Sequence, residues 1–363
     1  MNFFEVILVI ILVGLLLALT SLYFTCTISG EGKNKIQDFK KNRIPLLVGT
    51  SSMVVLYIFI LSVRSLDFGV DTATYASLFH DFCSGDKDVG NDASFIYSLN
   101  WLNFFMFGAC DVNILPMAWG AGFMVPFLFM RMKFNFKIYF FSLLLFSIIG
   151  VEFTTNALRQ GFSLGFLIVA ISYFDRRNIL AIVFLIVSIL FHSSSFLVFA
   201  MYILTKLRRR VFYLFFFFSI FFVCALVNFE INIPIISSFM YEIKKYLLHD
   251  SDEIFIRVFA FLSLISIYIL SIGDNKFYSG ESIGFRLLAL RLCFLCIPFL
   301  WLPYFGYRIV YGVYPVVLFL IMKDISSRKK NDDRKVFIML VFNVIIILAW
   351  AVGSNHMRNT NFI

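Results

Sequence analysis

Long apolar runs alternate with short polar connections along nearly the whole chain. A transmembrane helix needs about 17–25 mostly apolar residues, so the pattern predicts an all-α, polytopic integral membrane helix bundle with about 12 transmembrane helices. The predicted spans lie near residues 3–24, 45–62, 112–130, 138–154, 156–174, 178–191, 194–205, 211–228, 254–272, 285–302, 308–322 and 336–351.

The composition agrees with this class. The chain has 363 residues, of which 61% are hydrophobic and 15% are charged, and it contains 49 phenylalanines. Soluble domains are closer to half apolar and a quarter charged. We find no linker or soluble segment, so residues 1–363 are expected to form a single transmembrane domain. The net charge of +9 then bears on orientation in the membrane and not on nucleic acid.

Lysine and arginine gather in five connections, which the positive-inside rule places in the cytoplasm: 33–43, 131–137, 175–177, 206–210 and 326–335. The acidic connections 64–94 and 229–253, like both termini, are expected outside. Residues 64–111 are predicted to form an outer, periplasmic loop with short helices. These are a helix over 72–82, with Asp71 as its N-cap, and a re-entrant or interfacial helix over 95–109.

Two polar interruptions fall on the outer side of this map. The spans between the connections 131–137 and 175–177 meet outside at "EFTTNALRQG" (152–161). There Asn156, Arg159 and Gln160 have the spacing i, i+3, i+4, which predicts one shared helix side. The run 178–205 begins and ends in the cytoplasm, so it must turn back at "FHSSSF" (191–196). His192 is therefore expected at the outer apex of a helical hairpin.

Basic side chains recur at the predicted outer helix ends: Arg64, Arg159, Arg257, Arg308 and His192. Ionisable groups at membrane level are costly and usually mark a site, and the arginine fork suits phosphate oxygens. The pattern thus predicts a diphosphate site at the outer face. A lone arginine near a helix end can instead be a snorkelling anchor, and this interpretation is preferred for Arg286 and Arg291.

Other candidate groups leave alternatives open. Asp71 and Tyr75 are i, i+4 neighbours, which suits a cap and an interfacial tyrosine. They also suit a carboxylate and a phenol that bind sugar hydroxyls or accept a proton. Cys83 and Cys110, both expected near the outer face, form either a disulfide or two separate thiols. The pairs Asp86-x-Asp88 and Asp250-x-Asp252 resemble the metal-binding pair of nucleotide-sugar enzymes. Both are expected outside, where nucleotide sugars are absent, so we predict neither a metal nor another cofactor.

Four segments resemble the EpsG-like family of bacterial polysaccharide polymerases: "RSLDFGVDTATY" (64–75), "ALRQGFSLGFLIVAISYFDRRN" (157–178), "LFHSSSFLVF" (190–199) and "YRIVYGVYP" (307–315). The resemblance implies a Wzy-type O-antigen or exopolysaccharide polymerase, a glycosyltransferase-C-like bundle in the bacterial inner membrane with its active site facing the periplasm. Such enzymes use undecaprenyl-diphosphate-linked oligosaccharide as donor and acceptor. The bilayer and a chain-length regulator are further candidate partners, and nucleic acid is not.

On this resemblance, together with the outer-face pattern, the predicted catalytic residues are Asp71, Arg159, His192 and Arg308. The predicted substrate-binding residues are Arg64, Tyr75, Asn156, Gln160, Arg257 and Tyr311. The arginines would hold the donor diphosphate and stabilise its developing charge. Either Asp71 or His192 would remove the acceptor proton. The alternative functions are a lipid-linked oligosaccharide flippase or transporter, an O-antigen ligase, and a membrane acyltransferase that uses His192.

Overall fold

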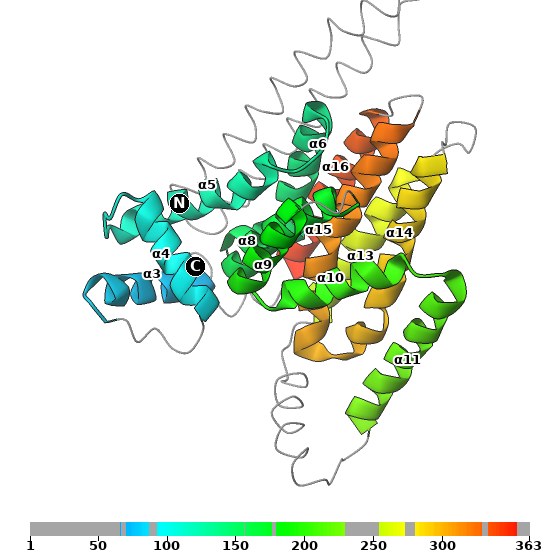
Figure 1. The fold of residues 1–363 in the computed structure, drawn as a ribbon, viewed down its shortest axis with the longest axis horizontal. Coiled ribbons are helices and arrows are strands. Elements are labelled where there is room, and N and C mark those ends of the chain that lie inside the picture. The colour runs from blue at the N-terminus through cyan, green and yellow to red at the C-terminus, as the bar shows by residue number, and fades with distance from the viewer. Residues whose placement is uncertain are drawn as a thin grey trace, which may run out of the picture. The chain divides into compact units, whose positions relative to one another are not determined.

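The computed structural model describes residue 66 and residues 70–86, 93–155, 157–175, 179–228, 254–272, 280–328 and 333–353. These described residues form helices and connections, with no strand among them (Figure 1). The predicted spans 3–24 and 45–62 lie outside them. The chain divides into two compact units. Unit 1 consists of Met1–Ser195, Lys330–Leu348 and Asn361–Ile363, and unit 2 consists of Phe196–Lys329 and Ala349–Thr360.

Unit 1 opens with the predicted outer helices. They are α3 (Val70–Cys83) and α4 (Ala93–Phe105), followed by η1 (Val112–Ile114) and α5 (Leu115–Leu128). Both short helices are therefore confirmed as helices. The N-cap expectation for Asp71 is corrected, because α3 begins at Val70 and Asp71 lies inside the first turn. A carboxylate there is still favoured by the positive end of the helix dipole.

A disulfide joins α3 to the segment that follows α4. Cys83 and Cys110 are bonded, with their Cα atoms 5.9 Å apart. Of the two alternatives that the sequence leaves open, the disulfide is the one that forms. The covalent link ties the end of α3 to the end of the segment that contains α4, so these two helices are held together without a large core of their own.

The predicted span 138–154 is not continuous, which corrects the sequence prediction. Two helices replace it, α6 (Phe134–Leu145) and α7 (Ile148–Thr155), and they are bent by 81°. Ser147 explains the bend: its Oγ donates to the Leu144 carbonyl at 2.6 Å and accepts from the Gly150 N–H at 3.0 Å. These bonds replace helical ones, so the backbone can turn while buried.

Helices α8 (Leu158–Phe174) and α9 (Ile179–Phe191) pack against each other in unit 1 (Figure 1). Two buried serines link them: Ser163 Oγ donates to the Ser188 carbonyl and Ser188 Oγ to the Ser163 carbonyl, each at 2.7 Å. The next helix, α10 (Ser194–Thr205), starts after a break at His192 and Ser193. The predicted interruption at "FHSSSF" is thus confirmed.

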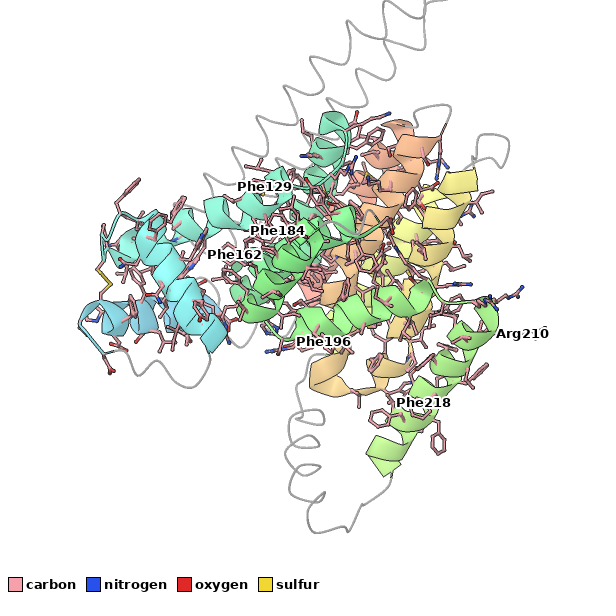
Figure 2. The ribbon with its side chains drawn as sticks, viewed as in Figure 1. Phe129, Phe162, Phe184, Phe196, Arg210 and Phe218 are labelled. Atoms are coloured by element: carbon pink, nitrogen blue, oxygen red, sulfur yellow. A yellow bond between two sulfur atoms is a disulfide. The ribbon has the colours of Figure 1, made fainter. Side chains whose placement is uncertain are left out.

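Unit 2 contains α11 (Arg209–Asn228), α13 (Ile254–Ser271), α14 (Gly280–Cys296), η3 (Pro298–Trp301) and α15 (Pro303–Ser327). The last described helix, α16 (Asp333–Gly353), belongs mostly to unit 1. Figure 2 shows phenylalanines along α11, and Phe218 is 60% exposed.

The snorkelling interpretation of Arg291 is corrected: its Nη1 donates to the carbonyls of Thr205 (2.6 Å) and Leu207 (2.9 Å). It therefore satisfies the C-terminal end of α10.

Within the described residues, two helices are long and apolar enough to cross a membrane, Ile283–Trp301 and Gly306–Ser327. The bent pair α6–α7 would add a third if it acts as one span. Several shorter apolar helices accompany them, including α8, α9 and α10. The helical class and its membrane character are confirmed in this part of the chain, whereas the count of 12 and the glycosyltransferase-C-like arrangement stay predictions.

Candidate functional site

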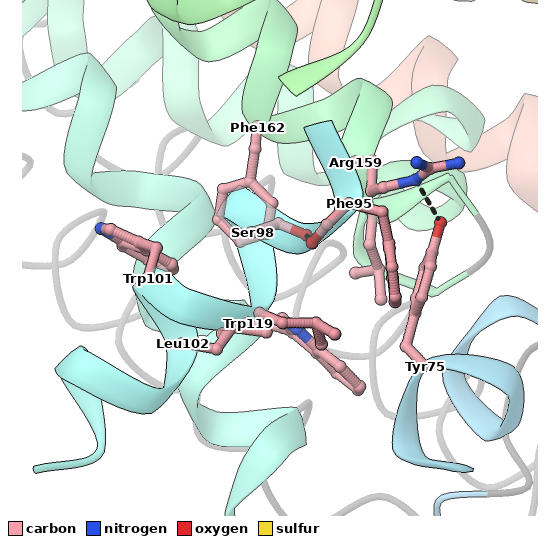
Figure 3. Close-up of a pocket in the computed structure, with 10 residues that line it drawn as sticks. Tyr75, Phe95, Ser98, Trp101, Leu102, Trp119, Arg159 and Phe162 are labelled. Atoms are coloured by element: carbon pink, nitrogen blue, oxygen red, sulfur yellow. Dashed lines mark hydrogen bonds between the residues drawn. The ribbon is translucent and has the colours of Figure 1, made fainter. Parts of the chain in front are cut away.

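Arg159 is the second residue of α8, and its guanidinium is placed by groups from two other helices (Figure 3). Its Nε donates to the Tyr75 hydroxyl on α3 at 3.1 Å. Its Cζ lies 5.2 Å from the Phe95 ring centroid on α4 and 5.9 Å from that of Tyr75. Cation–π contacts of this kind contribute about 0.5–2 kcal/mol and leave the charge intact. The half-buried cation is therefore fixed in direction.

Aromatic rings form the frame around this cation. Tyr75 and Phe95 stack at 5.1 Å, and Trp119 on α5 meets Tyr75 edge-on at 6.1 Å. A cavity lies beside these rings. The centre of a water molecule can occupy about 10 Å³ of it, which is room for roughly one water molecule. The lining residues are Tyr75, Phe95, Ser98, Leu99, Trp101, Leu102, Trp119, Leu158, Arg159 and Phe162. The pocket is small in this arrangement, so a larger ligand needs movement of α3 or α4.

The hydrogen bonds of His192 identify the tautomer of its ring. Nδ1 accepts from the Ser194 backbone N–H at 3.2 Å and lies 2.7 Å from Ser194 Oγ. A backbone N–H only donates, so Nδ1 is the accepting nitrogen and the proton of the neutral ring is on Nε2. In this arrangement the ring offers a donor at Nε2.

The serine pair places Arg159 and His192 at the same end of α8 and α9. Ser163 and Ser188 face each other on antiparallel helices. Arg159 lies one turn before Ser163 and His192 one turn after Ser188, and one turn rises about 5.4 Å. Ser163 Oγ also donates to the His192 carbonyl at 3.2 Å. Arg159, which is bonded to Tyr75, and His192 thus lie at the same end of the α8–α9 pair.

The remaining predicted site residues fall into three groups. Asp71 is half-buried one turn before Tyr75 on α3, and Gln160 is buried in α8. Arg308 lies near the start of α15 in unit 2, where its Nε donates to the Tyr307 hydroxyl at 3.4 Å, and buried Tyr311 packs beside Tyr307. Arg257 lies in the first turn of α13 in unit 2.

Two of the predicted site residues, Arg64 and Asn156, lie outside the described residues. The gathering of Arg257 and Arg308 with Arg159 stays a prediction, because they belong to different units. No group of three or more His, Cys, Asp or Glu side chains that could hold a metal is found in the described parts of the chain.

Sequence reasoning missed the aromatic partners of Arg159. Phe95 and Trp119 are 4% and 2% exposed, and in a chain so rich in aromatic residues they resemble any other core position. The serine pair between α8 and α9 was missed as well. Its only sequence signal is a serine inside each apolar run, a pattern that also occurs at positions without an interhelical bond.

The comparisons with known proteins agree with the motifs. No curated protein and no solved structure matches the chain. The model of the EpsG family matches residues 50–363, well over half of the chain. This match includes all the segments that resemble the family and all the described helices. The chain therefore belongs to the EpsG family, whose members are Wzy-like, polysaccharide polymerase-like membrane proteins.

Proposed function

We propose that the protein is a membrane glycosyltransferase that polymerises undecaprenyl-diphosphate-linked oligosaccharide repeat units into O-antigen or exopolysaccharide. The reaction takes place at the outer face of the bacterial inner membrane. The observation that supports it most directly is that Arg159, bonded to Tyr75, and His192 lie at the same end of the α8–α9 pair in unit 1. A cation, a phenol and an imidazole N–H are suited to a diphosphate and the sugar attached to it.

Charge at this end of unit 1 favours an anion. Arg159 is in the first turn of α8, whose N-cap Ala157 makes no side-chain cap bond. Helix N-termini carry partial positive charge and backbone N–H groups that bind phosphate. In our proposal Arg159 and the Nε2–H of His192 bind the donor diphosphate and stabilise the charge that develops as it leaves. Arg308 and Arg257, which belong to unit 2, are also proposed to bind the substrate.

In the proposed reaction, the Asp71 carboxylate accepts the proton of the acceptor sugar's hydroxyl group. The acceptor hydroxyl oxygen forms a bond to the anomeric carbon of the donor sugar. The bond from that carbon to the diphosphate oxygen breaks, and its electron pair leaves with the diphosphate. With Nδ1 accepting and Nε2 protonated, His192 is suited to donate, so the Asp71 carboxylate, one turn from Tyr75, is the better proton acceptor.

The Cys83–Cys110 disulfide supports the outer placement of the site. Disulfides persist in oxidising compartments and are rare in the cytoplasm. The bonded cysteines flank the segment with α4, and α3 and α4 supply Tyr75 and Phe95. This argument is independent of the lysine and arginine distribution, and both support an outer position for α3 and α4.

A second candidate function is a lipid-linked oligosaccharide flippase. Transporters commonly contain broken helices that line their substrate path, and the 81° bend between α6 and α7 is such a break. The bent pair leads directly into α8, so it also serves to position Arg159. An O-antigen ligase is a third candidate, because it would bind the same lipid diphosphate.

The test uses a deletion strain that carries plasmid variants, with its surface polysaccharide separated on a gel. Arg159→Ala should accumulate normally but leave a single-unit band, since loss of one transition-state contact costs about 10²–10³ in rate. Arg159→Lys should restore short chains only, because an ammonium lacks the bidentate fork. Exposed Arg210 provides the control, and Arg210→Ala should give a normal ladder.

Other outcomes separate the candidates. A normal ladder from Arg159→Ala would refute the diphosphate site. Loss of all attached glycan would favour the flippase or the ligase. Chain extension by the purified protein on lipid-linked repeat units, without a membrane potential or a second compartment, then distinguishes a polymerase from both.

A further inference from the structure

The end of α4 carries an exposed cluster of phenylalanines, which we call the Phe tip: Phe104, Phe105 and Phe107. Their exposed fractions are 83%, 40% and 99%. The opposite side of α4 is buried in unit 1 through Phe95, Leu99 and Leu102. We propose that the Phe tip inserts into the outer leaflet of the lipid bilayer, as an anchor separate from the spanning helices.

The backbone of the tip is suited to a medium without water. The N–H groups of residues 106–109 donate to the carbonyls of Leu102, Phe104, Asn103 and Met106, at 2.8–3.1 Å. These bonds close the C-terminal turn of α4, including a bond from Gly108 to Asn103 that spans five residues. Unpaired backbone groups are too costly in hydrocarbon, and this turn leaves few of them.

Phe107 occupies a backbone conformation that large residues avoid. Its φ is +54°, and it takes the position at the helix end where glycine is usual. The chain has a glycine next to it, Gly108, which also has positive φ. The turn thus places a fully exposed ring where a small residue would be less strained. Such a strained, apolar position is expected where the ring itself makes a contact.

Polarity changes along the outward side of α4. Tyr97 and Asn100 lie in the first two turns or so of α4, Phe104 lies in its last turn, and Phe107 follows its end. No residue from 93 to 110 is charged. Tyrosine and asparagine suit the headgroup region, and phenylalanine suits the acyl boundary. The order predicts that the helix enters the leaflet with the Phe tip deepest.

The disulfide identifies which leaflet is involved. Cys110 lies three residues after Phe107 and is bonded to Cys83, which requires an oxidising compartment. The Phe tip therefore faces the outer leaflet. The other end of α4 carries Phe95 beside Arg159 (Figure 3), so an anchored tip would hold the Arg159 pocket near the level of lipid headgroups.

The test is photocrosslinking of the full-length protein in vesicles of phosphatidylethanolamine and phosphatidylglycerol. Phe104 and Phe107 are each replaced by p-benzoylphenylalanine, which keeps an aromatic ring. His80, exposed on α3, is replaced in the same way as the control. After irradiation we expect a mass shift of one phospholipid on the peptides with positions 104 and 107, and none on the peptide with position 80.

Two outcomes would overturn the proposal. One is a crosslinked dimer, which would show that a second copy covers the tip. The other is crosslinking within the chain, or no adduct, at both tip positions. Phe105 offers a third position if one variant does not accumulate, and retention of the disulfide on a non-reducing gel confirms folding. The readout needs no enzymatic activity, so it is independent of the proposed function.

Discussion

At the scale of single residues, the two nitrogens of His192 have different roles. Nδ1 accepts from the Ser194 backbone N–H, so the proton of the neutral ring is on Nε2. A ring held in this way acts as a donor unless its tautomer changes, and that change would break the bond from the Ser194 N–H. The same residue in a base role would need the opposite tautomer.

Glutamine and asparagine at position 192 separate these roles. Glutamine places an amide N–H near the position of Nε2, whereas asparagine is too short and reaches only the position of Nδ1. If His192 donates from Nε2, His192→Gln should keep much of the chain-extension rate, and His192→Asn should lose about 10²-fold or more. The measurement is turnover of lipid-linked repeat units by purified protein. Equal, near-complete loss in both variants would contradict the donor role.

Residues such as Arg159 and His192 could be predicted because a polar side chain stands out within an apolar run. The aromatic partners could not be predicted in this way. Phe95 and Trp119 become distinctive only through their contacts with Tyr75 and Arg159, and those contacts join four helices. Arg291 shows the opposite error: its position suggested a membrane anchor, whereas its partners are two backbone carbonyls.

At the scale of elements, most helices follow the apolar runs closely. Helices α9 and α10 begin and end within one residue of the predicted spans 178–191 and 194–205. The bend between α6 and α7 could not be predicted from the apolar runs, because Ser147 and Gly150 are ordinary residues of transmembrane helices. The bend depends on where the Ser147 hydroxyl bonds and on close approach at Gly150, and neither alters the hydropathy.

A substitution at Gly150 tests the bend between α6 and α7. A Cβ added there would lie 1.9 Å from the Leu144 carbonyl oxygen, so the turn must open to accept alanine. Gly150→Ala should lower stability by about 1–3 kcal/mol, the usual cost of overpacking, and should reduce activity by moving α8. The measurement is the thermal midpoint of the purified protein. Gly284→Ala, with nothing within 4 Å of the added Cβ, is the control and should not be destabilised.

At the scale of the whole molecule, the disulfide stabilises the α3–α4 segment. Cys83 and Cys110 are 27 residues apart. Closing a loop of this length lowers the entropy of the unfolded chain, which stabilises the folded state by about 3.5 kcal/mol. Cys83→Ser should lower the thermal midpoint and remove the difference between reduced and non-reduced samples. Cys224→Ser, which removes an exposed thiol that is not part of the disulfide, is the control. An unchanged midpoint in Cys83→Ser would contradict a structural role for the bond.

Two unrelated physical effects indicate the orientation of the chain in the membrane, and they can be tested together. Basic residues in short loops stay in the cytoplasm during insertion, which predicts that exposed Arg208, between α10 and α11, is inside. Thiol oxidation occurs outside, which predicts that Asp86, three residues after Cys83, is outside. Because the two effects act at different stages of biogenesis, their agreement would be strong support for the map.

The measurement is labelling of single added cysteines in intact cells by a membrane-impermeant maleimide, with the free cysteines replaced and the disulfide kept. Asp86→Cys should react in intact cells, and Arg208→Cys only after lysis. Reaction of both in intact cells would disprove the predicted cytoplasmic connection at 206–210 and reverse the spans around it. Reaction of Asp86→Cys only after lysis would place α3, and with it Tyr75 and the Arg159 pocket, on the cytoplasmic side. Polymerisation at the outer face would then be impossible.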